Sequence, residues 1–233
     1  MSHRVRVWDL PTRLFHWLLV FFIVALVITG YTGGNAMAWH ARCGYAVLTL
    51  LLFRIVWGFV GGHWSRFRSF VYAPASMLAY LGGRARADHV VGHNPLGAGS
   101  VFAMLLVLLA QVATGLIGDD ESAFTGPLNR FVASATGLRA TWYHKSVGQW
   151  LLAALVVLHI VAVLWYLRRK RQNLVRPMIV GDKELPAPAK PSRDDLASRL
   201  VALAVVVVCA ALVAWLVSLG AAPPAMSSAV RAD

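Results

Sequence analysis

Five long apolar stretches constrain this 233-residue chain more than any other feature of its sequence. A helix needs about 20 largely apolar residues to cross the hydrocarbon core of a bilayer, and each stretch comes close to that length. The stretches are Leu14–Gly30, Gly44–Val60, Ser100–Ile117, Val147–Leu167 and Leu200–Leu219. Charged residues make up only 14% of the chain, against about 25% in soluble domains. The sequence therefore predicts an all-α integral membrane protein formed by a single helical bundle.

The net charge of +12 is concentrated in alternate connections between these stretches. The basic connections contain Arg4, Arg6, Arg13, Arg66, Arg68, Arg84, Arg86, Arg168, Arg169, Lys170, Arg171 and Arg176. The remaining connections are poorer in basic residues, and one carries the acidic run Asp119–Glu121. Because basic loops stay on the cytoplasmic side, the N-terminus is expected in the cytoplasm and the C-terminus, after five spans, outside it. The natural partners of these charges are anionic lipids rather than nucleic acid.

Four histidines lie in or beside the apolar stretches, where ionisable side chains usually mark a ligand site or a conduction path. His16 is in the first stretch, His40 precedes the second, and His144 and His159 belong to the fourth. His144 and His159 are 15 residues apart, which in an α-helix is roughly 22 Å along the axis with an angular offset of about 60°. Since the first helix runs outward and the second and fourth run inward, His16 matches His159 in depth, and His40 matches His144.

Two histidine pairs at opposite depths suit the axial ligands of two stacked haems, which predicts a transmembrane electron carrier. No CxxCH motif is present, so the haems would be non-covalent and b-type. The alternative for each histidine is a packed polar residue hydrogen-bonded to a neighbouring helix. Zinc is a weaker rival, because it usually needs three or four close ligands and each depth offers two. The other histidines, His3, His63, His89 and His93, are expected to be solvated or interfacial.

Two basic residues are candidates to bind haem propionates. Arg54 follows His40 by 14 residues, about 21 Å deeper on nearly the same helical face, at the level of the His16–His159 pair. A cation inside a span needs a counter-charge, which a propionate would supply, although Arg54 could instead extend to the interface. Lys145, beside His144, could serve the outer haem in the same way or lie at the interface.

In its motifs the chain resembles the bacterial cytochrome b561 family, which overlaps the b-type cytochrome subunits of nickel–iron hydrogenases. The likeness covers about residues 3–180 and rests on VWDLPTRLFHW, WHARCGY, FRIVWGFVG, GDDESAFTGPL and YHKSVGQWLLAALVVLH in this order. It implies a four-helix core in a bacterial inner membrane, with the C-terminus in the periplasm. Two b-type haems in this core exchange electrons between a membrane quinone (ubiquinone or menaquinone) and a partner protein or small oxidant. The family's ligand positions fall on His16, His40, His144 and His159. A fifth C-terminal transmembrane helix departs from the commonest four-helix pattern.

These inferences divide the chain into four parts and leave its function with alternatives. Residues 1–180 form the di-haem domain, 181–198 a Pro-rich charged cytoplasmic linker, 199–220 an accessory helix and 221–233 a periplasmic tail. The leading hypothesis is electron transfer between quinone and an extracytoplasmic redox protein, such as a c-type cytochrome or a dehydrogenase subunit. No catalytic residue is assigned, and the sequence shows no convincing internal repeat.

Two alternative functions remain open. One is a superoxide oxidase that passes electrons to quinone, with Lys145 and Arg139 or Arg130 attracting the anion. The other is a membrane anchor for a hydrogenase or dehydrogenase complex. A haem-free transporter is remote, because the stretches show few midplane polar breaks. The aromatic and basic residues near the cytoplasmic-side haem are candidates to contact quinone: Trp8, Trp17, Arg54, Trp57 and Trp165.

Overall fold

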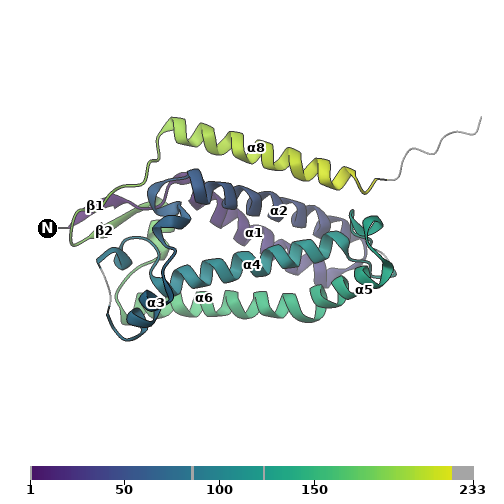
Figure 1. The fold of residues 1–233 in the computed structure, drawn as a ribbon, viewed down its shortest axis with the longest axis horizontal. Coiled ribbons are helices and arrows are strands. Elements are labelled where there is room, and N and C mark those ends of the chain that lie inside the picture. The colour runs from purple at the N-terminus through teal and green to yellow at the C-terminus, as the bar shows by residue number, and fades with distance from the viewer. Residues whose placement is uncertain (1, 85–86, 123, 222–233) are drawn as a thin grey trace, which may run out of the picture.

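The computed structural model describes residues 2–84, 87–122 and 124–221 as a bundle of long helices with a small two-stranded sheet at one end (Figure 1). The strands are β1 (His3–Arg6) and β2 (Asp182–Leu185). The α-helices are α1 (Leu10–Thr32), α2 (Met37–Val60), α3 (Pro74–Leu81), α4 (Pro95–Ile117), α5 (Ser134–Tyr143), α6 (Gln149–Arg169), α7 (Val175–Val180) and α8 (Leu196–Ser218). Short 3-10 turns cover Gly34–Ala36, His63–Ser65, Phe67–Ser69, Ala87–Val90 and Asn129–Phe131, and a π-helical turn covers His144–Gly148.

Five helical segments are long and apolar enough to cross a membrane, which confirms the predicted helical membrane bundle. α1, α4 and α8 begin before the corresponding apolar stretches, and a polar side chain caps the start of each of them. Asp9 accepts a hydrogen bond from Thr12 N at the start of α1, and Asn94 accepts one from Gly97 N at the start of α4. Such caps satisfy backbone donors that the first turn leaves free.

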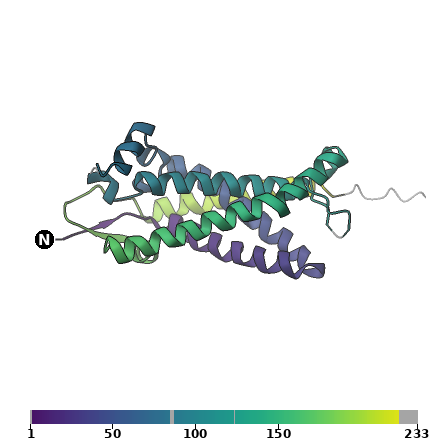
Figure 2. The ribbon, with the colours of Figure 1, turned by 90° about the horizontal axis from the view of Figure 1, so that it is seen from below.

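The long helices run along a common axis, with the sheet at one end and α5 at the other (Figures 1 and 2). We refer to these as the sheet end and the α5 end. α2 packs against α1, α4 and α8, whereas α6 packs against α4. The main core forms around α2, with Leu51 and Trp57 almost fully buried. α8 lies along the outside of the bundle against α2, and it buries Ala202, Cys209 and Val213 there.

The range 181–198, expected to be a linker, is folded onto the N-terminus. β2 pairs antiparallel with β1, with Arg6 opposite Asp182. Arg6 also forms an ion pair with Asp194 at 2.8 Å, and Ser192 donates a hydrogen bond to Val7 O at 2.7 Å. The acidic side chains of this range thus meet the basic residues before α1, and α8 is tied to the four-helix core. Residues 222–233, most of the expected tail, lie outside the described residues.

A buried carboxylate fixes the start of α1 at the sheet end. Asp9 is fully buried and accepts hydrogen bonds from Thr12 N, Trp57 Nε1, Gly62 N and Ser65 Oγ at 2.7–3.2 Å. A Cβ at Gly62 would collide with this carboxylate. The VWDLPTR motif and the GG pair after α2 therefore form one hydrogen-bonded junction, which holds α1 against α2 just before His16.

Two histidine pairs between the helices

The four histidines of the predicted site meet as two pairs. At the sheet end, His16 of α1 and His159 of α6 have ring centres 6.4 Å apart. At the α5 end, His40 of α2 and His144 of the π-helical turn have ring centres 6.1 Å apart. These are the pairs that were predicted from the direction of each span and the depth of each histidine.

The spacing of both pairs fits two imidazoles on one metal. A metal–imidazole nitrogen bond is about 2 Å long and the ring centre lies about 1 Å further, so axial rings stand about 6 Å apart. α6 has no buried residue, and its His159 is partly exposed. Within the described residues, no three His, Cys, Asp or Glu side chains cluster as a metal site. With two imidazoles at each site, the residues present fit a haem, which would take two such ligands, better than zinc, which usually needs three or four.

Each α5-end histidine is held through its Nδ1 atom by the preceding long helix. His40 Nδ1 lies 3.0 Å from Leu26 O and 3.4 Å from Thr29 Oγ1 in α1. His144 Nδ1 lies 2.9 Å from Gln111 O and 3.3 Å from Thr114 Oγ1 in α4. A carbonyl oxygen can only accept, so Nδ1 carries the proton in both rings. The Nε2 lone pair is then left for a metal.

These contacts reveal a short repeat that our sequence analysis missed. Residues 25–30 read ALVITG and residues 110–115 read AQVATG, identical at four of six positions. In each copy the threonine hydroxyl donates to the alanine carbonyl four residues earlier, Thr29 to Ala25 at 2.6 Å and Thr114 to Ala110 at 2.8 Å. The A-x-V-x-T-G pattern was the available signal, but its meaning depends on the histidine of the next helix.

The glycine that ends each copy makes room for the ring. A Cβ at Gly30 would lie 3.2 Å from both Cε1 and Nδ1 of His40. A Cβ at Gly115 would lie 3.3 Å from Cε1 and 3.6 Å from Nδ1 of His144. Since favourable carbon contacts lie at about 3.5–4.0 Å, a side chain at either position would press on the ring.

The π-helical turn at His144–Gly148 changes the angular relation between the histidines of the fourth span. Gln149 N donates to His144 O five residues earlier, and Gln111 Nε2 donates to the same carbonyl at 3.0 Å. The turn takes up one extra residue, so His144 and His159 are separated by about 14 α-helical steps. This changes the expected offset of about 60° to about −40°. A Cβ at Gly148 would collide with Gln111 Oε1 and lie 2.9 Å from Tyr143 Cε1, so a larger residue there would displace the Gln111 amide.

A charged and aromatic cluster lies at the sheet end. Arg54 is only 3% exposed, its guanidinium lies 4.8 Å from the Phe67 ring centre, and its Nη1 has no hydrogen-bond partner among the described residues. His93, expected to be solvated or interfacial, packs its ring between Trp8 at 4.8 Å and Phe70 at 4.4 Å. Burial and the nearby Arg54 charge lower the pKa of His93 to about 3. Its imidazole is therefore neutral at physiological pH.

His89 is also buried, at 5% exposure, which again differs from the expected solvated state. Its ring contacts Tyr72 and Tyr80 at 5.1 and 5.4 Å. His3, by contrast, is exposed in β1, and His63 is partly exposed. The connection between α2 and α4 thus folds its histidines against aromatic rings.

The structure divides the four tryptophans among the quinone candidates into two groups. Trp57 stacks on Phe53 in the core and Trp8 is buried against His93. Trp17 and Trp165 are half-exposed on α1 and α6, at 43% and 48%. Only this second group offers aromatic surface to a molecule that approaches through the lipid.

The basic residues considered at the α5 end are all at the surface. Lys145 and Arg139 are exposed. Arg130 is exposed too, but it donates to the Leu219 and Ala221 carbonyls at the end of α8. Arg130 therefore fastens α8 to the rest of the α5 end.

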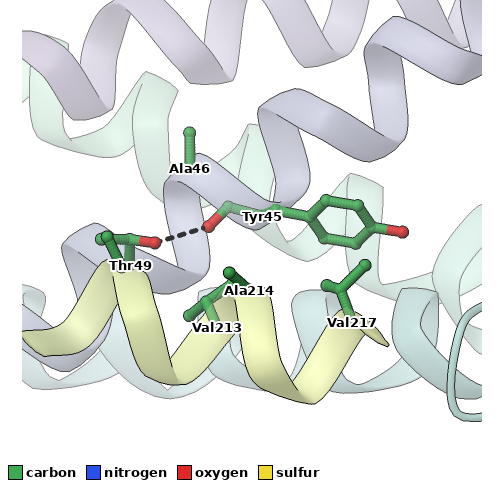
Figure 3. Close-up of a pocket in the computed structure, with 7 residues that line it drawn as sticks. Tyr45, Ala46, Thr49, Val213, Ala214 and Val217 are labelled. Atoms are coloured by element: carbon green, nitrogen blue, oxygen red, sulfur yellow. Dashed lines mark hydrogen bonds between the residues drawn. The ribbon is translucent and has the colours of Figure 1, made fainter. Parts of the chain in front are cut away.

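A cavity of about 370 Å³ lies away from the histidines, between α2 and α8 (Figure 3). Tyr45, Ala46 and Thr49 of α2 face Ala210, Val213, Ala214 and Val217 of α8 across it. Its lining includes the hydroxyl residues Tyr45 and Thr49 but no charged group and no histidine, so it does not belong to the paired site.

Comparisons with known proteins agree on one family. The family model described as prokaryotic cytochrome b561 matches residues 7–181. Three curated relatives have almost the same name. Those of Bradyrhizobium diazoefficiens and Cupriavidus necator are named "Probable Ni/Fe-hydrogenase B-type cytochrome subunit", and that of Escherichia coli K12 is named "Probable Ni/Fe-hydrogenase 1 B-type cytochrome subunit". That of Bradyrhizobium diazoefficiens is 26% identical over 77% of this chain and 86% of its own. Those of Escherichia coli K12 and Cupriavidus necator are 27% and 28% identical, over 70% and 75% of this chain and 83% and 85% of theirs. No solved structure matches.

Proposed function

Since the chain belongs to the prokaryotic cytochrome b561 family, we propose that it moves electrons through the membrane on two b-type haems, one held by each histidine pair. The observation that carries the proposal is the spacing of the rings, 6.4 Å at the sheet end and 6.1 Å at the α5 end. Each bound haem would accept and release one electron at its iron.

The residues around each pair have separate tasks in this proposal. His16 and His159 bind one haem through their ring nitrogens, and His40 and His144 bind the other through Nε2. The apolar faces of α1 and α6 exclude water, which strengthens charge interactions inside the bundle. Arg54 neutralises a propionate at the sheet end, supported by its burial and its unpartnered Nη1. We propose the corresponding role for Lys145 because it adjoins His144.

The sheet end is proposed to face the cytoplasm and to exchange electrons with ubiquinone or menaquinone. Basic residues before α1 and after α6 gather at this end, as the positive-inside rule requires of the cytoplasmic side. The half-exposed indoles of Trp17 and Trp165 provide the aromatic surface. A photoreactive quinone analogue should label peptides containing these residues, and labelling confined to the α5 end would contradict the assignment.

Substitution of single histidines tests the haem sites. His16→Ala and His40→Ala should each lower the haem content of the purified protein from about two per chain to about one. His3→Ala is the matched control, because His3 is exposed and outside both pairs. Double variants distinguish the pairings: His16→Ala with His159→Ala should still retain one haem, whereas His16→Ala with His40→Ala should retain none. The pairing would be contradicted if the His16→Ala, His159→Ala variant lost both haems, or if the His16→Ala, His40→Ala variant kept one.

A second, more specific function is favoured by the names of the relatives. Because these proteins are named as hydrogenase cytochrome subunits, we propose that the chain is the membrane subunit of such an oxidoreductase, with its partner at the α5 end. In membranes of the native host, hydrogen should then reduce the b-type haems. Absence of hydrogen-dependent reduction in membranes with active hydrogenase would leave quinone and another redox protein as the partners.

A further inference from the structure

The two histidine pairs differ in how their rings are held. At the α5 end, both Nδ1–H groups have a carbonyl at 2.9–3.0 Å and a threonine oxygen at 3.3–3.4 Å. At the sheet end, the buried Nδ1 of His16 lacks any hydrogen-bond partner within the described part of the chain. Each α5-end ring is held by its own copy of the repeated hexapeptide, so this difference between the two ends of the bundle is encoded in the sequence.

We propose that Thr29 and Thr114 are positioning residues which, together with the Leu26 and Gln111 carbonyls, give the α5-end site a lower reduction potential than the sheet-end site. The inference rests on the proposed haem function and adds to it the direction in which electrons run downhill.

The threonine hydroxyls are oriented to accept rather than to donate. Both hydroxyls donate to backbone carbonyls, Thr29 to Ala25 O at 2.6 Å or Leu26 O at 3.3 Å, and Thr114 to Ala110 O at 2.8 Å or Gln111 O at 2.9 Å. Each oxygen therefore presents a lone pair to the Nδ1–H of its histidine. A histidine that donates this proton becomes a more basic ligand. A more basic ligand stabilises the ferric state and lowers the reduction potential.

Charge acts in the same direction at the sheet end. The buried Arg54 cation favours the reduced form of a nearby haem, because reduction adds one electron, and the buried Asp9 carboxylate that interacts with Arg54 offsets part of this effect. Lys145 would act oppositely at the α5 end, but it is exposed and its effect is screened by water and salt. Between haems held at the two sites, an electron would move from the one bound by His40 and His144 to the one bound by His16 and His159, with no proton transferred.

The test is an optical redox titration of the purified haem-loaded protein. His16→Ala and His40→Ala, which each retain one haem, identify which potential belongs to which site. In the wild type, the α5-end haem should titrate at the lower potential. Thr29→Val and Thr114→Val keep the side-chain shape and remove the acceptor oxygen, so each should raise the α5-end potential and leave the sheet-end potential unchanged. Their shifts should be similar in size, because the two sets of distances match.

Two further variants separate this role from a structural one. Thr29→Ser keeps the hydroxyl and should restore the wild-type potential. Thr32→Val is the matched control, because Thr32 makes the same kind of bond, to Ile28 O in the same helix, without being part of either histidine's hydrogen bonds.

The titration also separates failure of this inference from failure of the proposed function. A reversed order of potentials in the wild type would overturn the inference, and so would threonine variants that shift neither site or shift both equally. The wild-type order needs no substitution, so a threonine variant that loses haem leaves this test intact. Absence of haem from the wild type would instead contradict the proposed function.

Discussion

Gly30→Ala tests how closely the protein fits its α5-end histidines. The added methyl group would lie 3.2 Å from both Cε1 and Nδ1 of His40, a few tenths of an ångström inside favourable contact. The ring cannot retreat freely, because Leu26 O holds its Nδ1 at 3.0 Å and the metal would hold its Nε2. Overpacking of this kind costs about 1–3 kcal/mol, which corresponds to roughly 5–150-fold weaker haem binding at this site.

The equivalent substitution in the second copy of the repeat should have a smaller effect. In Gly115→Ala the methyl group would lie 3.3 and 3.6 Å from the same two atoms of His144. Neither substitution should unfold the protein, since replacing a helical glycine by alanine contributes up to about 1 kcal/mol of helix stability. Gly44→Ala in α2 is the control, because a Cβ there would have nothing within 4 Å.

The assay is the rate of haem transfer from the detergent-solubilised protein to a haem-scavenging apoprotein. Gly30→Ala should release its α5-end haem fastest, Gly115→Ala should be intermediate, and Gly44→Ala should match the wild type. Circular dichroism should be the same for all four proteins. If Gly30→Ala retained both haems as firmly as Gly44→Ala, the ring would have room that the structure does not give it, and the steric reasoning would be refuted.

Three further predictions concern the sheet end. Arg54→Leu should lower the sheet-end haem potential by on the order of tens of millivolts, measured by redox titration, and an equal shift in both haems would refute a local role. Asp9→Asn leaves the Gly62 N–H facing an amide instead of a carboxylate, so the unfolding free energy should fall by about 1–3 kcal/mol, and an unchanged thermal midpoint would contradict this. Burial lowers the pKa of Lys183 from 10.5 to about 8, so the unfolded chain binds more protons between these values and stability should rise as pH increases from 8 towards 10.5. Lys183→Met should remove this rise, as followed by thermal unfolding across that pH range.

The sequence was sufficient to predict the five spans and the depths of the four histidines. Both depend on local properties: the length of an apolar run, and the fixed rise of an α-helix. The alternation of helix direction then selected which rings could meet, and the structure brings together His16 with His159 and His40 with His144. These inferences needed no knowledge of side-chain packing, because a helix that crosses a bilayer has few alternatives for its direction and depth.

The tertiary structure decided the features that depend on contacts between distant residues. The π-helical turn at His144 rests on Gln111, 33 residues earlier, and on the small size of Gly148. The charged segment after α7 folds because β2 meets β1, with Glu184 opposite Arg4 across almost the whole chain. That segment is rich in proline and charged residues, and such a composition is compatible both with a linker and with a strand that has ionic partners. Hydropathy and spacing describe one helix at a time, whereas the hydrogen bonds that orient the histidine rings exist only between helices.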